Sequence, residues 1–345
     1  MRNPALGLLL LGAAALAACQ DHASPSADQS QTPALAKAAK AAPALNGSPT
    51  QRAGQIVERV NARLAAAGST RRLDEVWMFS LGQGTDPFRR LRTGSRWVNP
   101  RSVTYSIDAS DLIQYDPSKP GAPFTDADVL AALLRAHETY NQVRNIVLHS
   151  TRVADDGGNN DILDGEIRNA NNECVDVVDL DADNLDSYDP ATGALSFEPV
   201  ADNLFGGWLA PTYFADCLGS DLILGVTWTF SDVDGALGDG LDGYRDRIYT
   251  EQFYNTRFAW VTQGSTFLGP TEDVESIVLH EVGHTHGLGH FGGPNVNQPF
   301  KLQPNGRVFD PEAVMNPFYL GGEKHELLPT DVAGLRALYA SKRLR

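Results

Sequence analysis

Four of the chain's eight histidines lie within the eleven-residue segment HEVGHTHGLGH. His280 and His284 are four residues apart, and Glu281 follows the first of them. Successive residues of a helix advance by about 100°, so these two rings lie on one face, one turn apart, and can bind one ion. Gly287 permits a bend that can return His290 to the same point. The spacing therefore predicts His280, His284 and His290 as metal ligands.

The remaining histidine, His286, lies about 240° around the helix from His280 and is expected to point elsewhere. Three neutral imidazoles leave one position of a tetrahedral zinc ion open, as in catalytic rather than structural zinc sites. Zinc lowers the pKa of water toward about 7. Glu281 can take a proton from that water during attack on a carbonyl and pass it to the leaving amine. These residues predict a hydrolase with Zn²⁺ as cofactor and Glu281 as its catalytic residue.

The helix that carries this segment is predicted to begin at Thr271, which can cap its first turn. Glu272 and Asp273 suit the positive end of the helix dipole, and Gly287 is expected to end the helix.

Other elements follow from periodicity. Residues 51–67 and 125–146 carry apolar residues at helical spacing, and the capped segment 328–339 predicts a closing helix. Residues 101–108 alternate apolar and polar residues, and 222–230 form an apolar run, so both predict strands.

The complete pattern H-E-x-x-H-x-x-G-x-x-H is the metzincin signature, and the chain resembles the matrixin (interstitial-collagenase-like) family. The resemblance rests on EDVESIVLHEVGHTHGLGH, AVMNPFY and the LPTD closing helix, with WVNPRSVTYSI as a weaker match, and covers residues 97–340. It implies an α+β fold, with a twisted mixed β-sheet packed against the active-site helix and the closing helix. It also implies zinc endopeptidase activity, often bound calcium, and a protein or peptide substrate laid along an edge strand.

Within this resemblance, Met315 is expected to form an apolar floor beneath the histidine ligands. Tyr319 is expected to pack against a pocket rather than to bind an oxyanion. The chain departs from the family where His286 replaces the usual leucine, and in its long Asp-rich insertions. The segment before Trp97 has no cysteine apart from Cys19, which excludes latency through a thiol on the metal.

The amino terminus is typical of an export signal, with Arg2 followed by the apolar run ALGLLLLGAAALAA. Residues 16–19 resemble a bacterial lipobox, so residues 1–18 are expected to be a signal peptide and Cys19 to carry a lipid anchor. Ordinary cleavage after Ala17 is the alternative, and it would release a secreted protein. The lipid anchor would place the protein in the bacterial cell envelope and give its only contact with a membrane.

Three further segments complete the predicted organisation. Residues 19–50 have the composition of a disordered tether. Residues 51–96 are interpreted as a helical segment, either pro-like or packed on the main domain. Residues 97–345 are expected to form the peptidase domain, with Asp-rich insertions at about 155–246.

Composition limits the partners and the ions. Lys and Arg number 28 against 43 Asp and Glu, giving a formal net charge of -15, which argues against nucleic acid. The Asp-rich insertions fit either structural Ca²⁺ or solvated turns, and none completes an EF-hand loop. Cys174 and Cys217 remain as a possible disulfide in an oxidising compartment.

Two functions are compatible with these features. The first is an exported zinc metalloendopeptidase. The second is a metal-binding surface lipoprotein, an adhesion or binding module with a non-catalytic zinc site. Glu281 favours the first, because a structural zinc site needs no carboxylate at that position. The sequence defines neither the physiological substrate nor the oligomeric state.

Overall fold

A computed structural model describes residues 42–81, 88–89, 95–189, 191–233, 244–294 and 309–340. The predicted signal peptide, Cys19 and most of the predicted tether lie outside these residues. Within the same ranges, no helix has the length and apolar character needed to cross a membrane.

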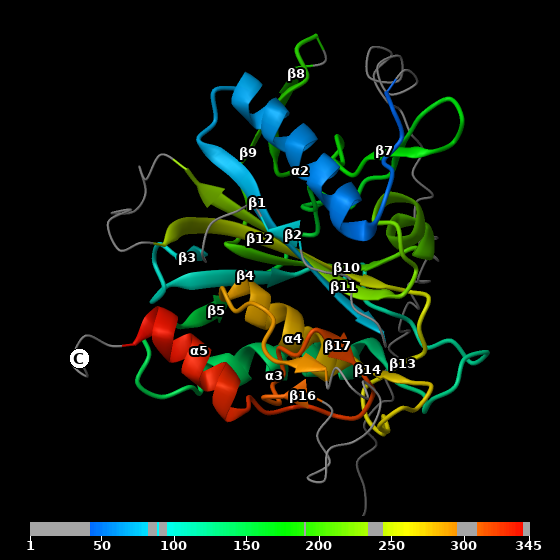
Figure 1. Ribbon diagram of the computed structural model, residues 1–345, viewed down its shortest axis with the longest axis vertical. Helices are drawn as coiled ribbons and strands as arrows, with labels where there is room; N and C mark the ends of the chain where they lie inside the picture. The colour runs from blue at the N-terminus through cyan, green and yellow to red at the C-terminus, as the bar shows by residue number, and fades with distance from the viewer. Residues whose placement is uncertain are drawn as a thin grey trace, which may run out of the picture.

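A mixed β-sheet lies at the centre of the molecule (Figure 1). Over the described residues its strand order is β17-β1-β11-β12-β10-β4-β5, with β2 beside β1 and β3 beside β12. The strand β11 lies antiparallel to both of its neighbours, β1 and β12, whereas β12, β10, β4 and β5 run parallel. The predicted α+β class with a mixed sheet is therefore confirmed. The strands are β1 (Arg71–Leu81), β2 (Phe88–Arg89), β3 (Ser95–Trp97), β4 (Val103–Ile107), β5 (Ser150–Arg152), β10 (Asn203–Leu209), β11 (Ile223–Asp232), β12 (Arg245–Asn255) and β17 (Phe318–Tyr319).

Helices cover both faces of this sheet. Figure 1 shows α2 on one side and α3, α4 and α5 on the other. Each side has its own apolar cluster, so the sheet is buried on both faces. The helical elements are α2 (Pro49–Ala66), α3 (Asp126–Asn141), the π-turn η1 (Tyr213–Cys217), α4 (Val274–Thr285) and α5 (Pro329–Tyr339).

Most of the predicted elements are present with small changes in their ends. The helix α2 matches the prediction for 51–67, and α3 begins after the predicted cap Thr125, whose side chain accepts from Asp128 N. The strands β4 and β11 match the predictions for 101–108 and 222–230.

The predicted cap of the metal-site helix at Thr271 is wrong. Asp273 caps α4, and its carboxylate accepts from Ser276 N at 2.8 Å. The reason is that Glu272–Asp273 (β14) pairs with Trp260–Val261 (β13), which keeps the chain extended until the helix begins.

The segment 51–96 contains a long strand that the sequence analysis did not expect. This strand, β1, lies antiparallel to β11 within the central sheet. Residues 73–80 are buried because α2 covers one face of β1 and α4 lies beneath the other. The amino-terminal segment is thus part of the same sheet as the metal-site helix.

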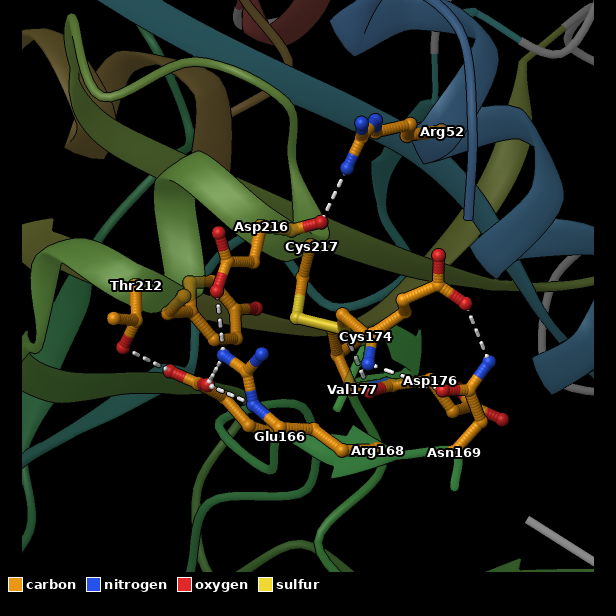
Figure 2. Close-up of a disulfide and its surroundings, with 12 residues drawn as sticks. Arg52, Glu166, Arg168, Asn169, Cys174, Asp176, Val177, Thr212, Asp216 and Cys217 are labelled. Atoms are coloured by element: carbon orange, nitrogen blue, oxygen red, sulfur yellow. Dashed lines mark hydrogen bonds and ion pairs between the residues drawn. A yellow bond between two sulfur atoms is a disulfide. The ribbon is translucent and has the colours of Figure 1, made fainter. Parts of the chain in front are cut away.

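The first part of the Asp-rich region forms two short hairpins, β6 with β7 and β8 with β9, whereas its later part supplies the central strands β10 and β11. The open question of the two cysteines is settled, because Cys174 and Cys217 form a disulfide that joins β7 to η1 (Figure 2). Around the disulfide, Arg168 bridges Glu166 and Asp216. The short strands of the chain are β6 (Ile167–Arg168), β7 (Cys174–Asp176), β8 (Leu185–Asp189), β9 (Ala194–Phe197), β15 (Gly293–Pro294) and β16 (Phe309–Asp310).

Replacing both cysteines by serine is expected to lower the free energy of unfolding by about 4 kcal/mol, because a closed loop of this length restricts the unfolded chain. The two cysteines are 43 residues apart. Urea unfolding of the parent and of the Cys174→Ser/Cys217→Ser variant measures the difference. An unchanged urea midpoint would contradict a stabilising role for the bridge.

Candidate metal centre

The side chains of His280, His284 and His290 converge as the sequence predicts. Their Nε2 atoms are 3.0 Å apart for His280 and His284, and 3.2 Å for each of these with His290. Three nitrogens that bind one tetrahedral zinc at 2.0–2.1 Å are about 3.3 Å apart. Among the described residues, these three form a group that could hold a metal ion. The predicted convergence is therefore confirmed.

Backbone carbonyls orient the two helical rings. His280 Nδ1 lies 2.8 Å from Val314 O, and His284 Nδ1 lies 2.8 Å from Leu288 O. Donation from Nδ1 to a carbonyl places the free lone pair on Nε2, which is the atom that faces the other rings. Burial lowers the pKa of both histidines well below the usual value, so the rings are neutral. Neutral imidazole is the form that binds a metal.

A glycine allows the chain to turn after α4. Gly287 has φ +88°, and a Cβ there would lie 2.6 Å from Ser95 O. Any other residue would meet both backbone strain and the neighbouring strand β3. This position is the bend predicted to return His290 to the helix.

A turn containing Met315 lies beneath α4. A Cβ on Gly283 would lie 2.2 Å from Met315 Sδ, so the glycine allows the sulfur to reach the helix backbone. The Asp331 carboxylate of α5 accepts from Met315 N and from Val314 N. Because Val314 O orients His280, α5 fixes one metal ligand through this turn.

Glu281, the residue after His280, is held as a buried carboxylate against β11. Its Oε2 accepts from the Thr227 hydroxyl at 2.5 Å, and its Oε1 has no hydrogen-bond partner among the described residues. A Cβ on Gly225 of β11 would lie 2.8 Å from that Oε1, so the glycine provides its space. Burial raises the pKa of Glu281 to about 8. A bound cation would oppose this rise.

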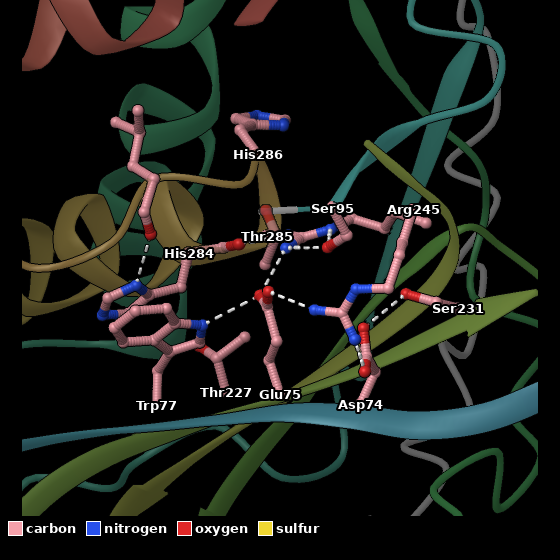
Figure 3. A network of polar contacts seen from close by, with 12 residues as sticks. Asp74, Glu75, Trp77, Ser95, Thr227, Ser231, Arg245, His284, Thr285 and His286 are labelled. Carbon is pink, nitrogen blue, oxygen red and sulfur yellow. Dashed lines mark hydrogen bonds and ion pairs between the residues drawn. The ribbon is translucent and has the colours of Figure 1, made fainter. Parts of the chain in front are cut away.

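His286 points away from His284 (Figure 3) and does not join the converging group, as predicted. Trp97 Nε1 donates to its Nδ1 at 3.4 Å, and its ring meets Tyr140 edge-on at 5.0 Å. Tyr319 is buried, and its hydroxyl donates to Gly322 O at 2.6 Å, in agreement with a packing role.

A buried ion-pair network supports the end of α4 and was missed by sequence reasoning (Figure 3). Arg247 of β12 donates to His284 O, and it also donates to Glu75 of β1 and to Ser95 of β3. Trp77 Nε1 donates to the same Glu75 carboxylate at 3.2 Å. These partners come from distant parts of the sequence, and no local pattern indicates that they meet.

A second, acidic group lies away from the histidines. Carboxylate oxygens of Asp108, Asp111 and Asp161 lie within 4.8 Å of one another. Asp161 is 1% exposed, and its Oδ1 has no partner among the residues that the structure describes. Burial, followed by the Asp164 and Glu251 charges, raises the pKa of Asp161 well above the usual value.

Consecutive glycines in β10 make room for this acidic group. A Cβ on Gly206 would lie 2.4 Å from Asp161 Oδ1, and one on Gly207 would lie 2.3 Å from Asp111 Cβ. Only Asp161 belongs to the Asp-rich region at 155–246. A Gly-Gly pair inside an apolar strand indicates that another part of the chain approaches the strand closely. This pair was the one sequence signal that could have indicated the acidic group.

Comparison with models of protein families and with curated proteins gave no match to this chain.

The metal centre is expected to take up one equivalent of a divalent transition metal. His290→Ala should weaken this binding by more than the roughly 10- to 100-fold lost when an outer partner of a metal ligand is removed. His286→Ala is the matched control, because it removes a buried histidine of the same segment that does not meet the other rings. Titration calorimetry measures both variants, and equal affinities would contradict the ligand assignment.

Proposed function

We propose that this chain is a zinc-dependent metalloendopeptidase of the matrixin-like metzincin type. The observation that carries the proposal is the convergence of three histidine rings, together with the buried Glu281 carboxylate, which has a hydrogen-bond partner on only one of its oxygens among the described residues. Within the described residues, no fourth His, Cys, Asp or Glu joins the group. Three protein ligands with an open position are characteristic of catalytic zinc.

Zinc suits the donor set best, since three imidazole nitrogens in tetrahedral array are common ligands of this ion. Bound zinc would act as a Lewis acid on water and on a substrate carbonyl. His280, His284 and His290 would hold it, and the carbonyls of Val314 and Leu288 would keep their Nε2 lone pairs directed at it.

Glu281 would act as the proton carrier of the reaction. Its Oε1 needs a partner, and a water molecule that gives up a proton would supply one. Thr227 holds Oε2, so the carboxylate keeps a fixed direction through both proton transfers. The same group would accept the proton during attack and donate it to the leaving amine.

The alternative, a binding lipoprotein with a non-catalytic metal, gives no role to Glu281. A buried carboxylate oxygen without a partner costs roughly 1–3 kcal/mol or more of folding free energy. A purely structural ion held by three histidines would not offset the cost of the unpartnered Glu281 oxygen. The amino-terminal signal and Cys19 support an exported, lipid-anchored peptidase equally well.

Glu281→Gln is expected to lower kcat by about 10²- to 10⁴-fold, the usual contribution of a positioned acid or base. The variant should still bind one zinc ion, because the three histidines are unchanged. Glu275→Gln is the control, since it alters a buried carboxylate on the same helix that pairs with Arg135 instead. Cleavage of a peptide library with and without a chelator is the measurement. Undiminished cleavage by Glu281→Gln would refute the mechanism.

We further propose that the acidic group holds a structural Ca²⁺. Asp108, Asp111 and Asp161 offer hard oxygen ligands, which calcium prefers, and Asp161 offers an oxygen that is buried without a partner. Asp108 and Asp161 are buried and Asp111 is exposed, and the repulsion among their carboxylates is the condition that a divalent cation relieves. The ion would then stabilise the sheet end where β4 and β10 meet.

Calcium is expected to raise the melting temperature more at pH 8 than at pH 5. Burial raises the pKa of Glu251 to about 7 and of Asp161 in the same direction. Without metal, the stability that these two protonated carboxyls contribute is fully present below their unfolded pKa of about 4. It is lost as the pH rises through their raised pKa values in the folded protein. Calcium at about 100 times its Kd would raise the free energy of unfolding by about 2.7 kcal/mol.

Asp161→Asn should remove the calcium response and raise the metal-free melting temperature at pH 8. Asp181→Asn changes an exposed aspartate of the same region and should leave both unchanged. Differential scanning calorimetry provides the comparison. An equal calcium shift in both variants would exclude this site.

A further inference from the structure

The strand β1 lies near the end of the sheet closest to the histidines, with only the two-residue strands β2 and β17 paired on its outer side. It pairs antiparallel with β11, from Arg71 opposite Asp232 to Ser80 opposite Ile223. On its other side, Glu75 and Val76 pair antiparallel with β2, and Ser80 and Leu81 pair in parallel with β17. Because β12 takes the opposite edge of β11, β1 occupies the only edge of β11 left for another strand within the described sheet.

Two side chains of β1 lie directly on the predicted metal ligands. The Phe79 ring stacks on His280 with centroids 3.6 Å apart and planes 8° apart. The Trp77 ring stacks on His284 at 4.5 Å and meets His290 edge-on at 5.3 Å. Figure 3 shows Trp77 against His284. These contacts help to leave His280 and His284 fully buried.

An open metal site needs access for an extended peptide. A peptide that adds to a sheet edge forms backbone hydrogen bonds with that edge and places alternate side chains in pockets. Here the backbone edge and the space over the rings are both filled by residues 75–81. A peptide substrate and β1 therefore compete for the same place.

We propose that β1 is a built-in competitor, a strand of this chain that occupies the peptide-binding edge and closes the metal centre until it is displaced. This inference rests on the proposed peptidase function. It also assigns a pocket, because the Phe79 side chain lies between His280 and Tyr319. The substrate side chain at this position would then be a large apolar or aromatic group.

The attachment of β1 is uneven along its length. Its first half is held by Asp74 and Glu75, which pair with Arg245 and Arg247 (Figure 3). The pairing register with β11 shifts between Leu73 and Glu75, and again between Phe79 and Ser80. The segment that covers the rings is thus bounded by irregular pairing on both sides, and displacement of this segment alone would open the site.

The test uses a fluorescent peptide with the sequence of residues 71–81 and the zinc-loaded full chain. Phe79→Ala removes the ring on His280 and should bind the peptide about tenfold more tightly than the parent, if it raises the open fraction from about 1% to 10%. It should also lose zinc to a chelator faster. Met78→Ala is the matched control, because Met78 lies between Trp77 and Phe79 in the sequence and is also buried, but packs into the apolar cluster on the α2 side.

A second measurement needs no variant and so does not depend on how the variants fold. Amide hydrogen exchange of the parent chain is followed with and without saturating peptide. Amides of residues 77–81 should lose protection when the peptide binds, while those of β12 should keep it. This pattern would report displacement of β1 directly.

The outcomes separate the two proposals. Equal peptide affinity in Phe79→Ala and Met78→Ala, with β1 protection unchanged by peptide, would show β1 to be a permanent strand and overturn the inference. Tighter peptide binding by Phe79→Ala without cleavage of any peptide would support the competing strand and contradict the peptidase. Faster cleavage by Phe79→Ala than by Met78→Ala would support both.

Discussion

The convergence of three imidazole nitrogens on one buried point is the constraint on which the rest of this structure depends. Nitrogens of His280, His284 and His290 lie 3.0–3.2 Å apart, and the Nε2 lone pairs of His280 and His284 are directed inward. Such an arrangement is unfavourable without a cation, because buried acceptors that face one another gain no hydrogen bond. The surrounding fold must therefore hold the rings in place at a cost in folding free energy. A bound ion would offset this cost and raise the free energy of unfolding.

The two rings on α4 are held from different directions. Val314 O fixes His280 through a turn that Asp331 of α5 supports, and Leu288 O fixes His284 through the bend at Gly287. Arg247 places a buried positive charge at His284 O, near the carboxyl end of α4, where the helix dipole favours a cation. The site thus depends on both α5 and the central sheet, although its ligands lie within eleven residues.

The sequence predicted the parts of this site that are local. Helical spacing placed His280 and His284 on one face, and the glycine at 287 predicted the bend to His290. The cap at Thr271 failed because β14 pairs with β13, a contact that no local pattern indicates. The strand β1 and the Asp108–Asp161 contact were missed for the same reason, since both depend on pairings between distant segments.

The same strand that hides the metal centre also helps to build it. Glu75 of β1 balances the buried charge of Arg247, and Arg247 holds the last turn of the ligand helix. Complete loss of β1 would leave that guanidinium buried without its carboxylate, which is strongly destabilising. Residues 75–76 and the ion pairs would then need to stay while the aromatic half moves. An opening confined to Trp77–Leu81 is the form of access that keeps the ligand helix intact, and the register shift at Phe79 marks where the pairing is weakest.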